Sequence, residues 1–130
     1  MFKLSTRVQY GLEVMEALAQ RPGYNSLSGI ARLTRRSANY LQQIIKPLKQ
    51  AGLIESKEGA TGGIKLTRRP DSVTLYEILQ ALDGAIQPIS CLAPDHVCPT
   101  KKTCGHRKYW SKVTAILEEQ FKQTTLVDLK

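Results

Sequence analysis

The spacing of apolar residues divides the first half of the chain into helices and a pair of extended segments. Apolar side chains recur at intervals of three and four between residues 8 and 19, which predicts a helix that stops before the Arg-Pro-Gly at 21–23. Ser28 is expected to cap a short second helix, and Ser37 a longer third helix. The buried face of the third helix should consist of Leu41, Ile44, Ile45 and Leu48.

The opposite face of the third helix is polar. Projected at about 100° per residue, it presents Asn39, Gln43, Lys46 and Gln50, with Gln42 on its flank. Pro47 removes one backbone hydrogen bond, so we expect a kink there and a straight segment over residues 37–46. A short helix, a turn and a helix with such a face are typical of a helix-turn-helix, although a helical hairpin with a solvated face fits this segment equally well.

The next segment favours DNA binding. Residues 53–57 and 64–67 predict two strands, and residues 58–63 a turn with three glycines. A hairpin directly after a recognition helix is a wing, so we predict a mainly α protein with a small β wing, a winged helix-turn-helix. Amides match the donor–acceptor pair of adenine in the major groove, and lysine suits guanine or phosphate. The expected DNA contacts are Ser37, Asn39, Tyr40, Gln42, Gln43, Lys46, Lys57, Gly59, Gly62 and Gly63.

The second half of the chain predicts two more helices. Thr74 and Glu77 form a capping box at the start of the first, which ends at residues 83–84. The second is a helix of about four turns marked by Trp110, Val113, Ile116, Leu117 and Phe121. Because so small a domain leaves this long helix few intrachain faces, we expect a homodimer built on it, with residues 124–129 forming one further turn over the interface.

These elements define three segments. We assign residues 1–72 to a winged-helix DNA-binding domain, residues 73–107 to a connecting helix and a cysteine-rich loop, and residues 108–130 to a dimerisation helix and tail. The whole formal net charge of +8 lies in residues 1–70, and residues 71–130 are neutral. Such segregation indicates a polyanionic partner, here double-stranded DNA.

Composition and motifs exclude several classes of protein. No signal peptide and no stretch of membrane-spanning length is recognisable, so we expect a cytoplasmic protein without a membrane partner. No nucleophile-and-base constellation, phosphate-binding glycine motif or cofactor fingerprint is present. An enzyme with a small-molecule substrate is therefore not expected.

All three cysteines and both histidines lie between residues 91 and 106, in a segment without hydrophobic periodicity that we expect to be a loop. Thiolates are soft ligands, which suits an iron–sulfur cluster. Zinc bound by the cysteines and His106 is chemically possible. A metal-free thiol sensor is also possible, because Lys101, Lys102 and Arg107 would lower the pKa of nearby thiols. The last alternative is that the three cysteines stay reduced and have no functional role.

Short motifs in a specific order connect this chain with a known family. They include Lys3-Leu4-Ser5-Thr6, Tyr40-Leu41-Gln42-Gln43, the segment from Leu48 to Ile54, Gly62-Gly63, Cys91, Cys98, Cys104, Trp110 and Thr124-Thr125-Leu126. Over nearly its full length the chain resembles the dimeric winged-helix transcription regulators that include IscR, NsrR and CymR. The resemblance implies a homodimer, expected to be a repressor, on a roughly palindromic operator.

The resemblance also implies a cofactor. Many members hold an iron–sulfur cluster with three cysteines and so sense redox, iron or iron–sulfur status; Cys91, Cys98 and Cys104 fall on those positions. A 2Fe–2S cluster is favoured over 4Fe–4S. The fourth ligand stays open: the histidine position of IscR is occupied by Arg107, His106 is one residue short of it, and Glu13 is a substitute from the first helix of the other subunit. A zinc-bound or metal-free thiol regulator is the alternative.

Two positions depart from the family pattern. Glu58 stands where many relatives place an arginine suited to a narrow minor groove. Either Lys57 takes over that contact or the wing stays out of the groove. Gln42 stands where IscR has a base-reading glutamate, so the operator sequence should differ.

Overall fold

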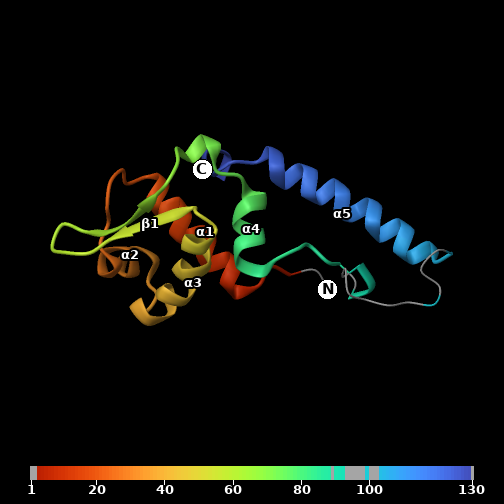
Figure 1. Ribbon diagram of the computed structural model, residues 1–130, viewed down its shortest axis with the longest axis horizontal. Coiled ribbons are helices and arrows are strands. Elements are labelled where there is room, and N and C mark those ends of the chain that lie inside the picture. The colour runs from red at the N-terminus through yellow and green to blue at the C-terminus, as the bar shows by residue number, and fades with distance from the viewer. Residues whose placement is uncertain (1–2, 89, 93–98, 100–102, 130) are drawn as a thin grey trace.

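The structure is a computed structural model that describes residues 3–88, 90–92, 99 and 103–129. Its first half contains α1 (Thr6–Ala19), α2 (Leu27–Thr34), α3 (Ala38–Gln50), β1 (Ile54–Lys57) and β2 (Gly63–Leu66). The second half contains the 3-10 turn η1 (Pro70–Ser72), α4 (Leu75–Asp83), the turn η2 (Ser90–Leu92), α5 (Gly105–Gln123) and the turn η3 (Leu126–Leu129). The predicted mainly α protein with a small β wing is confirmed (Figure 1).

Serine and threonine side chains begin the helices of the winged-helix unit. Ser37 Oγ accepts the Tyr40 N–H at 3.2 Å at the start of α3, as predicted. For α2 the predicted cap is wrong, because Ser26 Oγ accepts the Gly29 N–H at 3.1 Å and Ser28 lies inside the first turn. Both serines precede the first buried residue of α2, Ile30, so the local pattern alone does not distinguish them.

A single hydrophobic core joins the helices to the wing. Leu41, Ile44, Ile45 and Leu48 are buried, as the pattern of α3 predicts, and α3 continues through Pro47 to Gln50. Buried residues of α1, β1, β2 and α4 belong to the same core. At Gly11 a Cβ atom would overlap the end of the Leu82 side chain, so the missing side chain allows α1 and α4 to approach closely. Helix α3 therefore rests on α1 and α4.

The wing is attached to the helix-turn-helix by backbone hydrogen bonds. Strands β1 and β2 are antiparallel, with Ile54 opposite Leu66 and Lys57 opposite Gly63. Asn25, just before α2, forms an additional bridge with Ile64: each N–H donates to the other's carbonyl oxygen, at 2.9 and 2.8 Å. The orientation of the wing relative to α2 is thus set by these bonds as well as by side-chain packing.

The C-terminal tail returns to the winged-helix unit. The Leu126 N–H donates to the Val73 carbonyl at 3.1 Å, and the Leu75 N–H donates to the Thr124 carbonyl at 2.8 Å. The Leu126 side chain is 2% exposed and belongs to the core. The further turn predicted at the end of the chain is present as η3, and its buried residue completes the core of its own chain. Its place over a dimer interface stays a prediction.

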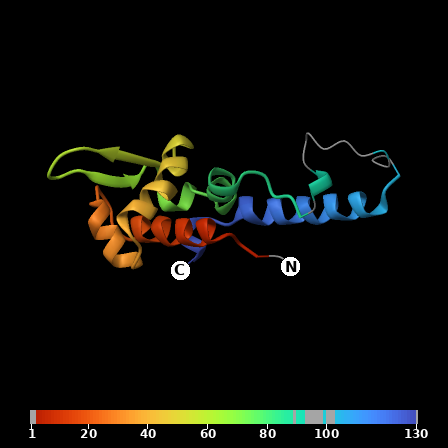
Figure 2. The same cartoon turned by 90° about the horizontal axis from the view of Figure 1, so that it is seen from below.

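Helix α5 projects from the rest of the molecule. Its C-terminal end lies beside α4, and its N-terminal half extends beyond the winged-helix unit toward η2 (Figures 1 and 2). It begins at Gly105, five residues earlier than the first marker of the predicted helix, and none of its 19 residues is buried. Nearly all of the described core therefore lies outside α5.

Glu77 stabilises the start of α4 in two ways. Its Oε2 accepts the Thr74 N–H at 2.9 Å, while Thr74 Oγ1 accepts the Glu77 N–H at 3.2 Å, which completes the predicted capping box. Its Oε1 lies 2.8 Å from Arg68 Nη2. Partial burial by itself would raise the pKa of this carboxyl, but the bonds from Thr74 and Arg68 outweigh burial and hold the pKa below its ordinary value.

Replacing Glu77 by alanine should therefore lower the free energy of unfolding by about 1 kcal/mol, the usual contribution of a helix cap. Glutamine can keep the capping bond without the charge, so it should cost less. A depressed folded-state pKa means that the charge stabilises the fold above the ordinary glutamate pKa of about 4.3, and that this contribution disappears as the pH falls through the folded-state value. Urea unfolding of the wild type and Glu77→Gln should show a difference at neutral pH that shrinks steadily as the pH is lowered below the ordinary glutamate pKa. A difference that is unchanged in acid contradicts the role of the charge.

Candidate nucleic-acid interface and cysteine segment

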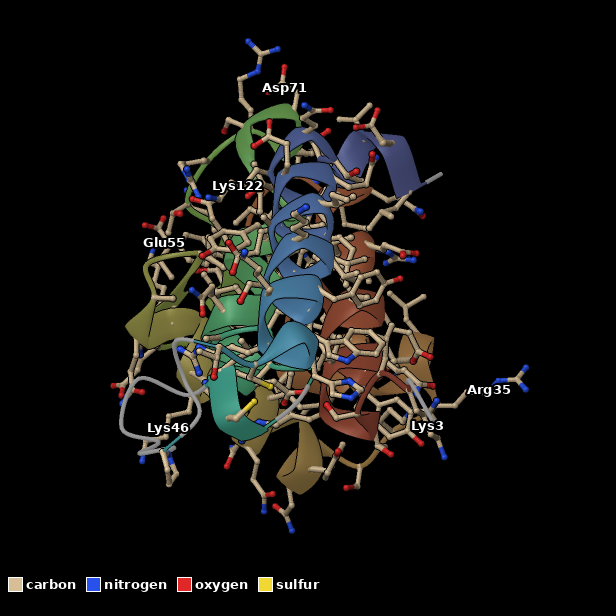
Figure 3. The ribbon with its side chains drawn as sticks, turned by 90° about the vertical axis from the view of Figure 1, so that its right-hand side faces the viewer. Lys3, Arg35, Lys46, Glu55, Asp71 and Lys122 are labelled. Carbon is tan, nitrogen blue, oxygen red and sulfur yellow. The ribbon has the colours of Figure 1, made fainter. Side chains whose placement is uncertain are left out.

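The predicted reading face of α3 is open to solvent. Asn39, Gln42, Gln43 and Lys46 are all exposed, and Figure 3 shows the Lys46 side chain pointing away from the molecule. The opposite face is locked into the core, so these four side chains are held on one rigid surface. Amide and ammonium groups on such a surface can donate and accept hydrogen bonds at base edges and phosphates.

Two further predicted contacts, Ser37 and Tyr40, lie at the start of α3. Ser37 is exposed, and its Oγ already accepts the Tyr40 N–H, which leaves the hydroxyl proton available for a further acceptor. Tyr40 is half-buried, and its ring meets the Tyr10 ring edge-on at 5.5 Å between centroids. Tyr40 is therefore also a packing residue between α3 and α1.

Sequence reasoning did not single out the residues of the turn between α2 and α3. Arg35 has φ +56, the left-handed conformation, and Figure 3 shows its side chain pointing outward. The Arg36 N–H donates to the Ala31 carbonyl at 3.1 Å, and its side chain lies against α1. Two adjacent arginines before a capping serine were the sequence signal for functional residues in this turn. The opposite directions of their side chains, however, depend on the left-handed backbone at Arg35.

The three wing glycines differ in their surroundings. Gly59 lies at the exposed tip, and a Cβ atom there would contact nothing within 4 Å. A Cβ atom on Gly62 would overlap the Lys57 carbonyl, and one on Gly63 the Asn25 carbonyl. Gly59 is therefore the wing glycine with free space around it, whereas Gly62 and Gly63 permit the hairpin to pack on itself and on Asn25.

The two lysines of the wing strands both lie near the Tyr24 ring. Lys65 Nζ is 3.1 Å from Glu55 Oε1 and 4.9 Å from the centre of the Tyr24 ring; Lys57 Nζ is 5.7 Å from the same ring. The hydrogen bond and the negative charge of Glu55 raise the pKa of Lys65. The Tyr24 hydroxyl donates to Glu55 at 3.2 Å. Lys57 pairs with Gly63 at the turn end of the strands, so Lys57 and Glu58 are adjacent exposed charges of opposite sign beside the tip.

The cysteine segment is helical at both ends. Cys91 lies in η2, and Cys104 is the N-cap of α5; both are half-buried and neither forms a disulfide. His106 is exposed in the first turn of α5. The expectation of a loop over residues 91–106 is therefore wrong at its two ends, because α5 begins earlier than its apolar period indicates. Cys98 and His96 lie outside the described residues.

Arg107 joins the two ends of this segment. Its Nη1 donates to the backbone carbonyl of Cys91, so a residue just inside α5 holds η2 against that helix. Within the part of the chain that the structure describes, no three cysteine, histidine or acidic side chains gather into a group able to hold a metal. Glu13, the substitute ligand considered from sequence, lies on α1 with its Oε1 3.3 Å from Arg36 Nη2.

The helices are also unlike membrane spans. Within the described ranges, none of them combines the length and the apolar character that crossing a bilayer requires.

Comparison with known proteins identifies the family. The family model Rrf2, described as an iron-dependent transcriptional regulator, matches residues 4–130. The chain belongs to the Rrf2 family of transcriptional regulators. The HTH-type transcriptional regulator CymR of Bacillus subtilis is 37% identical over 129 residues, which are 98% of this chain and 88% of the relative. The regulator IscR of Cereibacter sphaeroides is 31% identical over 98% of this chain and 86% of its own length.

Solved structures of this family have the same fold. The structure of CymR, described as the global cysteine regulator of B. subtilis, matches 99% of this Rrf2-family chain and 96% of its own with a TM-score of 0.78 at 37% identity. The structure of T. potens IscR matches with a TM-score of 0.75 at 34% identity, over 98% of this chain and 85% of its own. The winged helix is thus confirmed, and the relatives are DNA-binding transcription regulators and not enzymes.

Proposed function

We propose that this Rrf2-family chain binds an operator in double-stranded DNA as a homodimer, with α3 in the major groove and the wing beside it, and represses transcription. The observation that carries the proposal is the exposed amide and lysine face of α3, held rigidly by the core and by the Ser37 cap. The net charge of +8 in residues 1–70 supports the same partner. Phosphate contacts would supply affinity, and the amides would supply specificity.

The surface of α5 supports a symmetric dimer. Ile116 and Tyr109 are 69% and 59% exposed, although both side chains are large and mostly apolar. Beside them, a groove of about 610 Å³ lies between α5, α4 and the start of α1, and its apolar lining includes Leu79, Val113, Leu117 and Phe121. A second copy would remove these surfaces from water and place two recognition helices on one duplex.

Variants of α3 test operator binding. After selection of a preferred duplex from a random pool, Gln43→Ala should weaken binding to it by about 1–3 kcal/mol, the effect of losing one base contact. Lys46→Met should weaken binding to every sequence and reduce the salt slope of log K by about one. Gln80→Ala, an exposed change on α4, is the matched control and should have no effect. If no preferred sequence emerges, or if Gln43→Ala binds as the wild type does, the proposed recognition helix is wrong.

The finer proposal concerns the cysteines. We infer that Cys91, Cys98 and Cys104 hold an iron–sulfur cluster, of the 2Fe–2S type, through which DNA binding responds to redox, iron or iron–sulfur status. Three points support this: the description of the family as iron-dependent, the soft thiolate donors, and the half-buried positions of Cys91 and Cys104. A cluster would supply a centre that oxidants or loss of iron can alter.

His106 is the preferred fourth ligand. It lies two residues after Cys104 with its side chain exposed, whereas the Glu13 carboxylate is paired with Arg36 in its own chain. A histidine ligand in place of a fourth thiolate raises the reduction potential of a cluster. The oxidised cluster would then be reduced by milder reductants than an all-thiolate cluster needs.

A second candidate is a metal-free thiol regulator. It is favoured by the 37% identity with CymR, whose structure is described as that of a global cysteine regulator. The half-buried thiols of Cys91 and Cys104, together with the nearby Arg107, suit such chemistry as well. A zinc-bound form of the same segment is the third possibility.

Anaerobic purification separates these candidates. With a cluster the protein should be coloured and contain about two iron and two sulfide per chain. Cys91→Ala and Cys104→Ala should lose both, while His106→Ala should shift the visible spectrum and Glu13→Gln should leave it unchanged. Colourless protein whose DNA affinity changes when its thiols are oxidised supports the thiol regulator instead. Stoichiometric zinc with no visible absorption supports the zinc form.

A further inference from the structure

Arg36 lies directly before the cap of the recognition helix but turns away from its reading face. Its Nη2 is 3.3 Å from Oε1 of Glu13, and its Cζ lies 3.7 Å from the centre of the Tyr10 ring. Both partners belong to α1. The guanidinium therefore connects the first helix of the chain with the residue that precedes Ser37.

Arg36 is less exposed than the other arginines near it in the chain. Its side chain is 31% exposed. Arg32 near the end of α2 and Arg35 in the turn are exposed, and Arg35 points outward (Figure 3). The Arg36 Nε is shielded from solvent and has no hydrogen-bond partner among the described residues. A guanidinium held in this way is poorly placed to contact a phosphate, which would require it to leave both Tyr10 and Glu13.

A second contact, between Tyr10 and Tyr40, connects α1 directly with α3. The Tyr10 ring that receives Arg36 on its face meets the Tyr40 ring edge-on, with an interplanar angle of 80°. Tyr40 lies in the first turn of α3, between the predicted base-reading residues Asn39 and Gln43. Tyr10 thus contacts α3 on the helix itself and, through Arg36, just before its cap. These two contacts lie at the start of α3 and add to its buried face in fixing the orientation of the first turn.

We propose that Arg36 is a positioning residue for DNA recognition: it sets the angle of α3 against α1 through Tyr10 and Glu13, so that Asn39 and Gln43 meet the base edges. This inference rests on the proposed operator binding. Its consequence is specific: loss of Arg36 should impair sequence discrimination while the phosphate contacts, which tolerate small shifts of long cationic side chains, persist.

The test compares specific with non-specific binding. Arg36→Met keeps an unbranched apolar stem and removes the charge; Arg36→Lys restores the charge without the planar group; Arg35→Met is the matched control in the same turn. Affinities for the selected operator and for a scrambled duplex are measured by fluorescence anisotropy over a range of salt concentrations, together with thermal unfolding of each variant.

Arg36→Met should bind the operator about tenfold more weakly or worse, comparable to losing one base contact, with the scrambled duplex and the salt slope unchanged. Arg36→Lys should recover part of the loss. If Arg36→Met is not folded, the comparison of Arg36→Lys with the wild type decides. Adding Glu13→Gln to Arg36→Met should weaken operator binding no further, because both changes remove the same contact.

Three results would overturn the inference. Equal losses on both duplexes with a salt slope smaller by about one would make Arg36 a phosphate contact. Lower thermal stability with unchanged operator affinity would make it a structural residue only. Operator affinity equal to that of the wild type in both Arg36 variants would leave it no role. If the wild type itself selects no sequence, the proposed function fails first, and the two failures are thereby distinguished.

Discussion

Replacing Leu126 by alanine is expected to lower the free energy of unfolding by about 2–5 kcal/mol, the range for large-to-small changes in a packed core. Leu126 is 2% exposed and packs in the core that α1, α3 and α4 share, although it lies near the end of the chain. Its backbone N–H is bonded to Val73 at 3.1 Å, which limits how far the tail can move to fill the space left by the substitution.

Val127→Ala is the matched control, because Val127 is 43% exposed. It should change the free energy of unfolding by less than about 0.5 kcal/mol. Guanidinium unfolding of both variants at one fixed protein concentration measures the difference, since the stability of a dimer depends on concentration. Equal, small effects of the two substitutions would mean that the tail is not part of the folded unit.

Replacing Gly63 by alanine should disrupt the wing. A Cβ atom there would overlap the backbone carbonyl of Asn25, which cannot rotate away as a side chain can, and its φ of +142 is itself unfavourable for alanine. The hydrogen bonds between Asn25 and Ile64 must then open. We expect a cost of more than about 2 kcal/mol in the free energy of unfolding. If the proposed operator binding holds, affinity should fall as well.

Gly59→Ala serves as the control for backbone conformation. Gly59 also has a positive φ, +107, but a Cβ atom there would contact nothing within 4 Å. It should therefore cost about 1 kcal/mol of conformational strain and leave the bridge intact. Amide hydrogen exchange at Ile64 distinguishes the two variants, since its N–H should lose protection only in Gly63→Ala. Equal exchange in both would show that the wing does not depend on Asn25.

Sequence by itself determined the elements whose causes are local. A capping serine bonds an N–H three residues ahead, so Ser37 and the pair Thr74 and Glu77 were predictable at their positions. The buried face of α3 follows from helical periodicity alone. Two serines before α2 had equivalent local patterns, and only the structure identified Ser26 as the N-cap. Helix α5 begins before its apolar pattern because polar residues also extend a helix.

Tertiary structure decided what depends on residues far apart in the chain. The contact of Arg36 with Tyr10 and Glu13, the bridge between Asn25 and Ile64, and the burial of Leu126 each join segments that no periodicity relates. Charge and composition indicated a DNA-binding half but not which arginine faces solvent. That distinction arises at Arg35, whose left-handed backbone sends its own side chain outward and directs Arg36 onto α1.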